Sequence, residues 1–308
     1  MCPHKFIMVY HEIRRRNGKI YNYIVRNIRV KDKWEKESKF VGKGKMSKEE
    51  VVKAIEDFKA EGCKYLAKSI YFLIEDIKEK FKNYLKKGGK SGRDKFNEWY
   101  FTELTYNSNA IEGNSLSLMD TARILNEGLI PKESSLREVY EVKNHKKAIE
   151  FMESYEGDFN ERFVLRLHSF ILKGIDDDNA GKYREIQVFI GGEDVKFPNF
   201  KEVPKLIEEM FKWYKENKKV LHAFELAALV SMKFVSIHPF VDGNGRVSRL
   251  IMNFILKKFG YPEINVYFKH RDNYLRAVRK ANDEDYLLIV DFLVKSLKLN
   301  YKFLEEKD

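Results

Sequence analysis

The feature that most constrains this chain is a pair of apolar segments separated by a short polar turn. Residues 223–235 read as a long apolar helix, and a second helix rich in Ile, Met, Phe and Leu follows over 244–259. Pro239 excludes helical backbone at His238, so the first helix has to end there. The turn at 242–245 reads Asp-Gly-Asn-Gly and leads directly into the second helix. The sequence therefore predicts two apolar helices joined by a glycine-rich turn.

Helical patterns also dominate the rest of the chain after residue 92. One segment breaks the series, because residues 184–197 contain Ile-Gln-Val-Phe-Ile, then Gly-Gly, then Val-Lys-Phe-Pro, which is typical of a small β-hairpin. The expected fold class is therefore mainly α, a helical bundle with a small β-hairpin. The other expected helices cover 94–111, 117–127, 135–155, 160–174, 200–217, 220–236, 272–282 and 284–305.

The N-terminal region has β character. Residues 6–30 are rich in Ile, Val and Tyr on both sides of Asn17-Gly18, and this dipeptide is the strongest short hairpin signal because both turn positions need positive φ. Residues 38–41 could add a short third strand. We therefore expect a β-hairpin module before the first helix.

Two helices and a glycine-rich stretch follow this module. Ser47 and Glu50 form a capping-box pattern that opens a helix to about residue 61, and a second helix is expected over 64–87. Residues 86–92 contain three glycines and have the composition of a linker. The expected division is a basic β-hairpin module at 1–45, a helical connector at 46–91 and a larger helical domain at 92–308.

The positive charge is concentrated at the N-terminus. The net charge is +11, and residues 1–45 hold thirteen Lys/Arg against four Asp/Glu, a balance of +9 that leaves +2 for the rest. A basic arm of this kind could contact nucleic acid, an acidic protein or anionic lipid, or it could be a solvated hairpin with lysines on its open face. The sequence leaves these readings open.

Composition argues against several classes of protein. No stretch approaches the roughly 20 uncharged apolar residues of a membrane helix, and residues 1–10 lack the pattern of a signal peptide. Cys2 and Cys63 are too few for a disulfide framework and have no metal-like spacing. We expect a cytoplasmic protein with no membrane association.

The turn between the two apolar helices has the chemistry of a nucleotide-phosphate site. A glycine-rich turn that opens a helix exposes backbone N–H groups and the positive end of the helix dipole, which suits phosphate. Arg246 and Arg249 share the first-turn face of this helix, and guanidinium groups bind phosphate oxygens in pairs. Asp242 is an oxygen ligand suited to Mg²⁺ on phosphates. His238 is the only group here that can take up a proton near neutral pH.

The whole segment from His238 to Arg249 resembles the signature of the Fic (filamentation induced by cAMP) family. That signature reads His-Pro-Phe-x-Asp/Glu-Gly-Asn-Gly/Lys-Arg, and here the second arginine lies three positions after the first. The resemblance implies a helical bundle with the motif on a loop between two central helices. The Doc-like branch has Ala and Lys where this chain has Gly243 and Gly245, so the two glycines favour AMP transfer over phosphate transfer.

The resemblance also implies a role for each residue of the loop. His238 would be the general base for a Tyr, Thr or Ser hydroxyl of a target protein, which then attacks the α-phosphate of ATP. Asp242 would hold Mg²⁺, and Phe240 would anchor the loop in the core. The phosphates would be bound by Gly243, Asn244, Gly245, Arg246 and Arg249.

Two further segments resemble parts of the family that bind substrates. Gly181-Lys-Tyr-Arg and the hairpin after it are similar to the flap, which clamps the target segment as an added strand; its candidate residues are Val188, Ile190 and Gly191. Tyr274 and Asn282 lie in a stretch similar to the region around adenine, and would contact the base. Without the family, the first segment reads equally well as a surface β-turn, and Tyr274 as a core or surface residue of a helix.

A third segment is similar to the inhibitory motif of the family, Ser/Thr-x-x-x-Glu-Gly/Asn. Here Ser108, Glu112 and Gly113 fill the pattern at the end of the helix expected over 94–113. In the family, the glutamate pairs with the second arginine of the signature and blocks the γ-phosphate site. The corresponding pair here is Glu112 with Arg249, because one guanidinium cannot serve a carboxylate and a phosphate at once.

The resulting hypothesis is a self-inhibited protein AMP transferase that uses ATP and Mg²⁺ and acts on an unidentified protein target. The same residues could instead remove AMP from a modified protein, with Glu112 activating water. A further alternative is a nucleic-acid-binding regulator that uses residues 1–45, with the Fic domain as a sensor. Self-modification and association of copies of the chain are both compatible with the resemblance.

Overall fold

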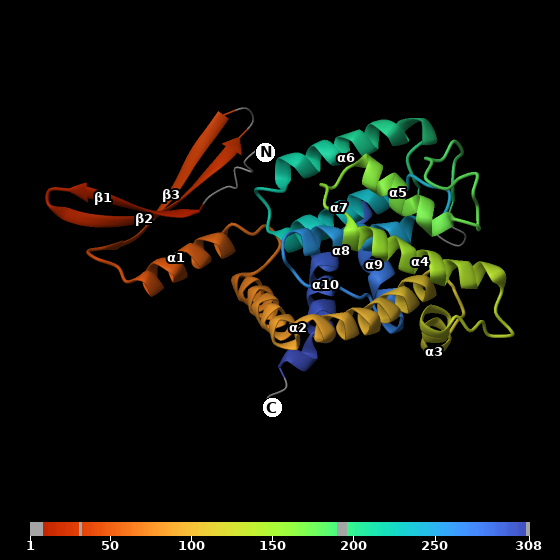
Figure 1. The fold of residues 1–308 in the computed structure, drawn as a ribbon. Coiled ribbons are helices and arrows are strands. Elements are labelled where there is room, and N and C mark those ends of the chain that lie inside the picture. The colour runs from red at the N-terminus through yellow and green to blue at the C-terminus, as the bar shows by residue number, and fades with distance from the viewer. Residues whose placement is uncertain (1–8, 31–32, 190–195, 306–308) are drawn as a thin grey trace.

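The computed structural model describes residues 9–30, 33–189 and 196–305, and it is mainly helical, as expected (Figure 1). A helical body carries a small sheet and one helix at its side. None of the helices in the described part of the chain is long and apolar enough to span a membrane. The strands are β1 (Tyr10–Arg16), β2 (Lys19–Val30) and β3 (Lys33–Lys43). The α-helices are α1 (Lys48–Glu61), α2 (Lys68–Ile111), α3 (Leu118–Ala122), α4 (Leu136–Ser154), α5 (Glu161–Leu172), α6 (Val203–Asn217), α7 (Ala223–Ile237), α8 (Asn244–Lys258), α9 (Arg271–Asn282) and α10 (Leu287–Asn300), with a π-helical turn at Arg123–Glu127 and 3-10 turns at Phe200–Glu202, Phe268–His270 and Lys302–Leu304.

The N-terminal strands form an antiparallel sheet in the order β1-β2-β3. Asn17 and Gly18 make the turn between β1 and β2 with φ of 48° and 71°, which confirms the predicted hairpin. The third strand is longer than the expected 38–41. Ser47 and Glu50 form the capping box at the start of α1, also as predicted.

The predicted linker at 86–92 is wrong. The region lies inside α2, and only Gly89 leaves helical geometry, with φ 59° and ψ −156°. Each glycine costs a helix about 1 kcal/mol, but α2 buries Ile74 and Ile77 before the kink and Phe96 and Tyr100 after it, which outweighs that cost. The glycines therefore produce a kink, and the division at residue 92 stays a prediction.

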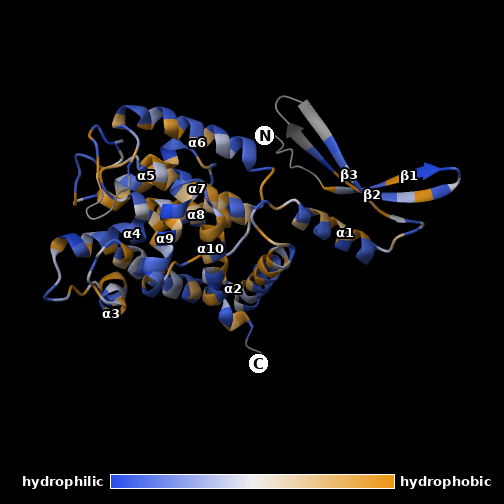
Figure 2. Ribbon diagram, turned by 180° about the vertical axis from the view of Figure 1, so that it is seen from behind, coloured by the Kyte–Doolittle hydropathy of each residue, from blue (hydrophilic) through white to orange (hydrophobic). Residues whose placement is uncertain are grey.

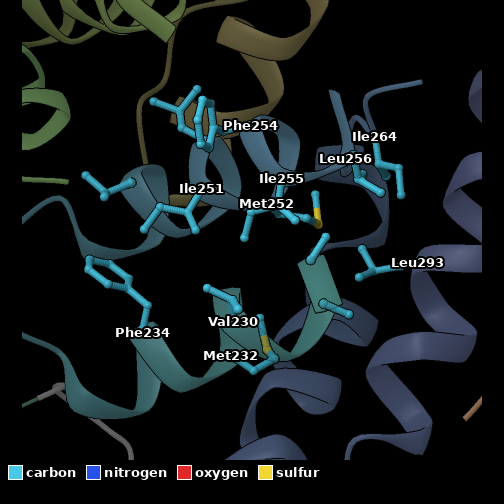
Figure 3. Packing of buried hydrophobic residues seen from close by; sticks show 14 of the residues in the cluster. Val230, Met232, Phe234, Ile251, Met252, Phe254, Ile255, Leu256, Ile264 and Leu293 are labelled. Carbon is cyan, nitrogen blue, oxygen red and sulfur yellow. The ribbon is translucent and has the colours of Figure 1, made fainter. Parts of the chain in front are cut away.

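The core of the helical body is built on α7 and α8. In Figure 3, Val230 and Phe234 from α7 face Ile251 and Ile255 from α8, and all four are fully buried. Figure 2 shows apolar residues concentrated in α7, α8 and α10. The two apolar segments recognised in the sequence are therefore the central helices, and the loop between them is fixed at both ends by the core.

The predicted hairpin at 184–197 is only partly covered by the structure. Val188 and its described neighbours at 184–189 and 196–197 are not in a strand. Ile190 and Gly191, with the rest of 190–195, lie outside the described residues. The ladder expected for this segment therefore stays a prediction.

Candidate active site

The loop from His238 to Gly243 ends at the N-terminus of α8, where backbone N–H groups are left without helical partners. His238 and Gly243 both adopt left-handed backbone, with φ of 49° and 79°, and the loop so formed leads directly into α8. The first intrahelical bond of α8 runs from Val247 N to Gly243 O. The N–H groups of Asn244, Gly245 and the residue after them therefore lack helical partners and carry the positive end of the helix dipole.

The loop is held rigid by its own side chains. Phe240 is fully buried, as predicted, and its ring stacks on that of His168 at 3.6 Å with an interplanar angle of 1°. Asn244 Oδ1 accepts from Phe240 N at 2.9 Å, and Asn244 Nδ2 donates to Phe240 O at 2.8 Å. The Asn244 side chain thus closes the loop, and any contact with phosphate falls to its backbone N–H.

His168 on α5 is a positioning residue that the sequence did not reveal. Its Nδ1 accepts from Gly181 N at 2.9 Å, so Nε2 carries the proton and donates to Asp242 O at 3.0 Å. Burial lowers the pKa of His168 to about 4, so the ring stays neutral. A lone histidine in an amphipathic helix gives no signal of this role in the sequence.

His238 has the tautomer that a general base needs. Its Nδ1 lies 3.3 Å from Val235 O, which can only accept, so Nδ1 carries the proton and Nε2 keeps its lone pair. Burial lowers the pKa of His238 to about 4, and Arg184 adds to the shift. The ring is stacked on Phe197 at 3.9 Å. At neutral pH the imidazole is therefore uncharged and able to accept a proton.

Arg184 connects the flap region to this loop. Its Nε donates to His238 O at 2.8 Å, its backbone N donates to Pro239 O at 2.9 Å, and its Nη2 donates to Pro198 O at 2.7 Å. The residue is only 2% exposed. The sequence pattern placed Arg184 in the flap motif, but only the structure shows that it binds the backbone of the histidine loop.

Asp242 belongs to a network of charged groups. Its Oδ2 accepts from Arg137 Nη2 at 2.6 Å, and its Oδ1 accepts from Arg246 Nη2 at 3.1 Å and from Gly243 N at 2.5 Å. Burial raises the pKa of Asp242, but these partners outweigh it and leave the pKa below its usual value. Glu141 on α4 pairs with both arginines, at 3.2 and 3.4 Å. Arg137 and Glu141 were not foreseen from the sequence.

The residues around Asp242 could supply one carboxylate ligand to a magnesium ion. In the described part of the chain, no group of three or more His, Cys, Asp or Glu side chains could hold a metal. Asp242 offers one carboxylate, which is 39% exposed and lies beside the anion site. Mg²⁺ bound mainly by phosphates and water needs no more than one or two protein carboxylates. The donor set therefore fits a metal that arrives with a nucleotide.

The predicted inhibitory pair is in direct contact. Arg249 Nη2 donates to Glu112 Oε1 at 2.8 Å and to Ser108 O at 2.8 Å, and Arg249 Nε donates to Ser108 Oγ at 3.0 Å. The Arg249 side chain is 4% exposed, and Gly113 ends the segment with φ 101°. Burial lowers the pKa of Arg249, but Glu112 outweighs this and raises it.

Glu112 also reaches the start of α8. A Cβ at Gly245 would lie 2.2 Å from Glu112 Oε1, so only glycine at this position leaves room for the carboxylate. The carboxylate therefore lies against the first turn of α8 and on Arg249 together. These are the two anion-binding features that the sequence assigned to phosphate.

The two candidate adenine contacts are placed differently from each other. Tyr274 is 4% exposed, and the guanidinium of Arg249 lies 6.0 Å from its ring centroid. The tyrosine ring therefore packs against the buried guanidinium through a cation–π contact. Asn282 is half-buried, and its Oδ1 accepts from Ser236 Oγ at 2.6 Å. Contact of either residue with a base stays a prediction.

Comparison with known proteins finds a family that this part of the chain resembles. Residues 158–256 match the family model described as Fic/DOC. The chain is 33% identical over 200 residues to a Drosophila melanogaster protein named protein adenylyltransferase Fic. The matched region covers 64% of this chain and 40% of that protein. A relative of the same name from Nematostella vectensis is 32% identical over 203 residues, covering 64% of this chain and 47% of the relative. The chain thus spans less than half the length of these curated relatives.

Two solved structures of Fic proteins are similar to this chain. A Fic domain-containing signaling protein from Bacteroides thetaiotaomicron matches with a TM-score of 0.68 and 28% identity, over 76% of this chain and 98% of that one. Fic-1 from C. elegans, residues 134–508, matches with a TM-score of 0.69 and 26% identity, over 82% of this chain and 73% of that one.

Proposed function

We propose, from the premise that this chain carries a Fic domain over residues 158–256, that it is a protein adenylyltransferase held inactive by its own Glu112. The name of the relatives supports AMP transfer. The contact that carries the proposal of self-inhibition is the one between Glu112 and Arg249. The target protein would present a Tyr, Thr or Ser hydroxyl.

His238 would act as the general base. Its free Nε2 lone pair takes the proton of the target hydroxyl as the oxygen forms a bond to the α-phosphorus of ATP. The bond from the α-phosphorus to the bridging oxygen of the β-phosphate breaks, and pyrophosphate leaves with the electron pair. The imidazolium then returns its proton to solvent. The hydrogen bond from His238 Nδ1 to Val235 O keeps the ring in the tautomer that this step requires.

The start of α8 would bind the triphosphate. The N–H groups of Asn244 and Gly245 point their partial positive charge at the phosphates, and Arg249 would hold the γ-phosphate. Arg246 is buried and lies beside this turn, with its Nη1 3.4 Å from Glu141 Oε1 and its Nη2 donating to Asp242 Oδ1 at 3.1 Å. Arg246 would contact the phosphate chain by exchanging one of these carboxylate partners for a phosphate oxygen.

Asp242 would hold the Mg²⁺ that accompanies ATP, a cation that would neutralise charge on the phosphates when bound. To do so it must loosen its ion pair with Arg137, whose side chain is 59% exposed and can move into solvent. Asp242 keeps its orientation meanwhile, because His168 and Gly243 hold its backbone and its other oxygen.

Self-inhibition would follow from competition for one site. While Glu112 is bound to Arg249 and lies against the first turn of α8, a γ-phosphate would meet a carboxylate where it needs a cation. ATP would then bind weakly or in a pose unfit for attack at the α-phosphorus. Removal of AMP from a modified protein would need the same Glu112, so a variant without this carboxylate separates the two activities.

The test is incubation with ATP and Mg²⁺ followed by intact-mass measurement of the protein. The samples are wild type, Glu112→Gly, and Glu112→Gly combined with His238→Ala. The proposal expects AMP-sized adducts on the Glu112→Gly protein alone. A wild type that gains as many adducts as Glu112→Gly would overturn the inhibitory assignment, and adducts on the double variant would overturn the role of His238.

A further inference from the structure

The N-terminal sheet has one face that packs against α1 and an opposite face, called here the open face, on which Val25 is buried and Phe40 is exposed. On the face that packs against α1, the guanidinium of Arg26 lies 5.1 Å from the ring of Phe58 in α1, and Lys39 forms an ion pair with Glu61 of α1 at 2.5 Å. Ile24 lies opposite Lys39 in the register and is fully buried. Because successive residues of a strand point to opposite faces, the neighbours of these residues face away from α1.

An aromatic cluster lies on the open face. Tyr23 is directly opposite Phe40, and Tyr21 lies two residues along the same strand. The Phe40 ring is 5.6 Å from that of Tyr23 and 6.2 Å from that of Tyr21, and Phe40 is 47% exposed. The three adjacent rings, with Phe40 exposed, present flat apolar surface on which another ring can stack.

Cations surround this aromatic cluster. Arg14 lies 4.0 Å above the Tyr23 ring, and Lys43 lies 5.7 Å from the Tyr21 ring. Arg16 is opposite Lys19 beside the hairpin turn. Among the ion pairs of the described residues, none involves Arg16, Lys19 or Lys43, and all three are exposed. Glu12, opposite Tyr23 in the register, pairs with Arg14 at 2.7 Å. The unpaired positive charge beside the aromatic rings therefore lies on Arg16, Lys19 and Lys43.

We propose that this open face binds single-stranded nucleic acid. Phosphates would lie on the cations, and unpaired bases would stack on the aromatic rings. In a duplex the flat faces of the bases are stacked on one another, so the rings would have no partner. An acidic protein would satisfy the cations, but it would need aromatic side chains of its own, placed among its carboxylates, to cover the rings. The inference uses residues outside the Fic domain and does not depend on AMP transfer.

The test is fluorescence anisotropy with the full chain and a labelled single strand of about 15 nucleotides. The same oligonucleotide annealed to its complement is the duplex probe, and poly-L-glutamate is the competitor. One variant reverses three charges of the face (Arg16→Glu, Lys19→Glu and Lys43→Glu), and another removes one ring (Phe40→Ser). The matched control reverses three exposed lysines of α6 (Lys205→Glu, Lys212→Glu and Lys215→Glu) and changes the net charge equally.

The proposal expects the single strand to bind more tightly than the duplex. The triple variant of the face should lose at least tenfold in affinity, and the slope of log K against log salt should flatten by about two. Phe40→Ser should lose roughly fivefold or more, because one stacked base is lost. The proposal would be overturned if the α6 control lost as much affinity as the triple variant of the face, or if the duplex bound more tightly than the single strand. It would also be overturned if poly-L-glutamate displaced the labelled strand as well as the unlabelled strand does, or if wild type did not bind the single strand.

Discussion

Glu112 Oε1 accepts a hydrogen bond from Arg249 Nη2 at 2.8 Å, although the two residues are 137 positions apart. The contact joins the end of α2 to the first turns of α8. It is reinforced by Ser108, which accepts two further hydrogen bonds from the same guanidinium. A buried arginine with this many partners is fixed in place, so any ligand that needs it must displace the carboxylate.

The pH dependence of AMP transfer should reflect the buried environment of His238. Burial lowers the pKa of His238 to about 4, so the base stays deprotonated well below neutral pH. In the Glu112→Gly protein, kcat/KM for ATP should stay level from pH 8 down to pH 5.5, since this quantity reports groups of the free enzyme. A fall to half its value near pH 6.5 would show that the base is an ordinary solvated histidine.

His145 should make the fold less stable in acid. Burial and the nearby Arg249 and Arg246 lower its pKa to about 3, against about 6.5 in the unfolded chain. Between these values the unfolded state binds more protons, so the free energy of unfolding decreases as the pH falls below 6.5. The contribution is about 1.4 kcal/mol per pH unit.

Urea unfolding of wild type and His145→Gln at several pH values between 7 and 5 measures this effect. The variant should have a shallower dependence of unfolding free energy on pH, by about 1.4 kcal/mol per unit. His270→Gln is the control for the loss of a histidine elsewhere. Parallel curves for His145→Gln and wild type would refute the assignment.

Alanine substitutions at two glycines near the kink in α2 should change the stability of the protein in opposite directions. Gly89 has φ 59°, so Gly89→Ala should destabilise the protein by about 1 kcal/mol or more through backbone strain. Gly92 is helical, and a Cβ there meets nothing within 4 Å, so Gly92→Ala should stabilise by about 0.5–1 kcal/mol. Thermal unfolding of both variants checks this, and a gain in stability for Gly89→Ala would mean that α2 is straight in solution.

Loss of the Arg184 side chain should lower the rate of AMP transfer more than it lowers the affinity for ATP. In the Glu112→Gly background, Arg184→Ala removes the bonds from its guanidinium to the carbonyls of His238 and Pro198. The rate of AMP transfer should fall by about tenfold or more, because the base is no longer held in position. The dissociation constant for ATP should change by less than about threefold. A matching loss in ATP affinity would place Arg184 in the nucleotide site.

Much of the helical body could be predicted from the sequence. Hydrophobic periodicity and caps gave α4 to α10 to within a few residues, and the Asn17-Gly18 turn gave the β1–β2 hairpin. These signals are local, so one sequence is enough to read them. The linker at 86–92 failed because burial of Phe96 and Tyr100 overrode the propensity of the glycines, and burial is not visible locally.

In the candidate site, too, some residues could be predicted from the sequence and others could not. The continuous motif from His238 to Arg249 was visible as a pattern. The residues that hold it came from distant elements, and His168, Arg137 and Glu141 carry no local mark of their roles. The placement of Tyr274 behind Arg249 also depends on tertiary packing, so the sequence suggested a contact with the base and could not show the contact with the arginine.

The most direct test of the central claim is calorimetric titration of ATP and ADP, each with Mg²⁺, into wild type and Glu112→Gly. Because Glu112 is bound to Arg249, which would otherwise take the γ-phosphate, its removal should strengthen ATP binding by about tenfold or more. ADP, which lacks that phosphate, should change little. An equal gain for ATP and ADP, or no gain for either, would contradict the claim that Glu112 occupies the γ-phosphate site.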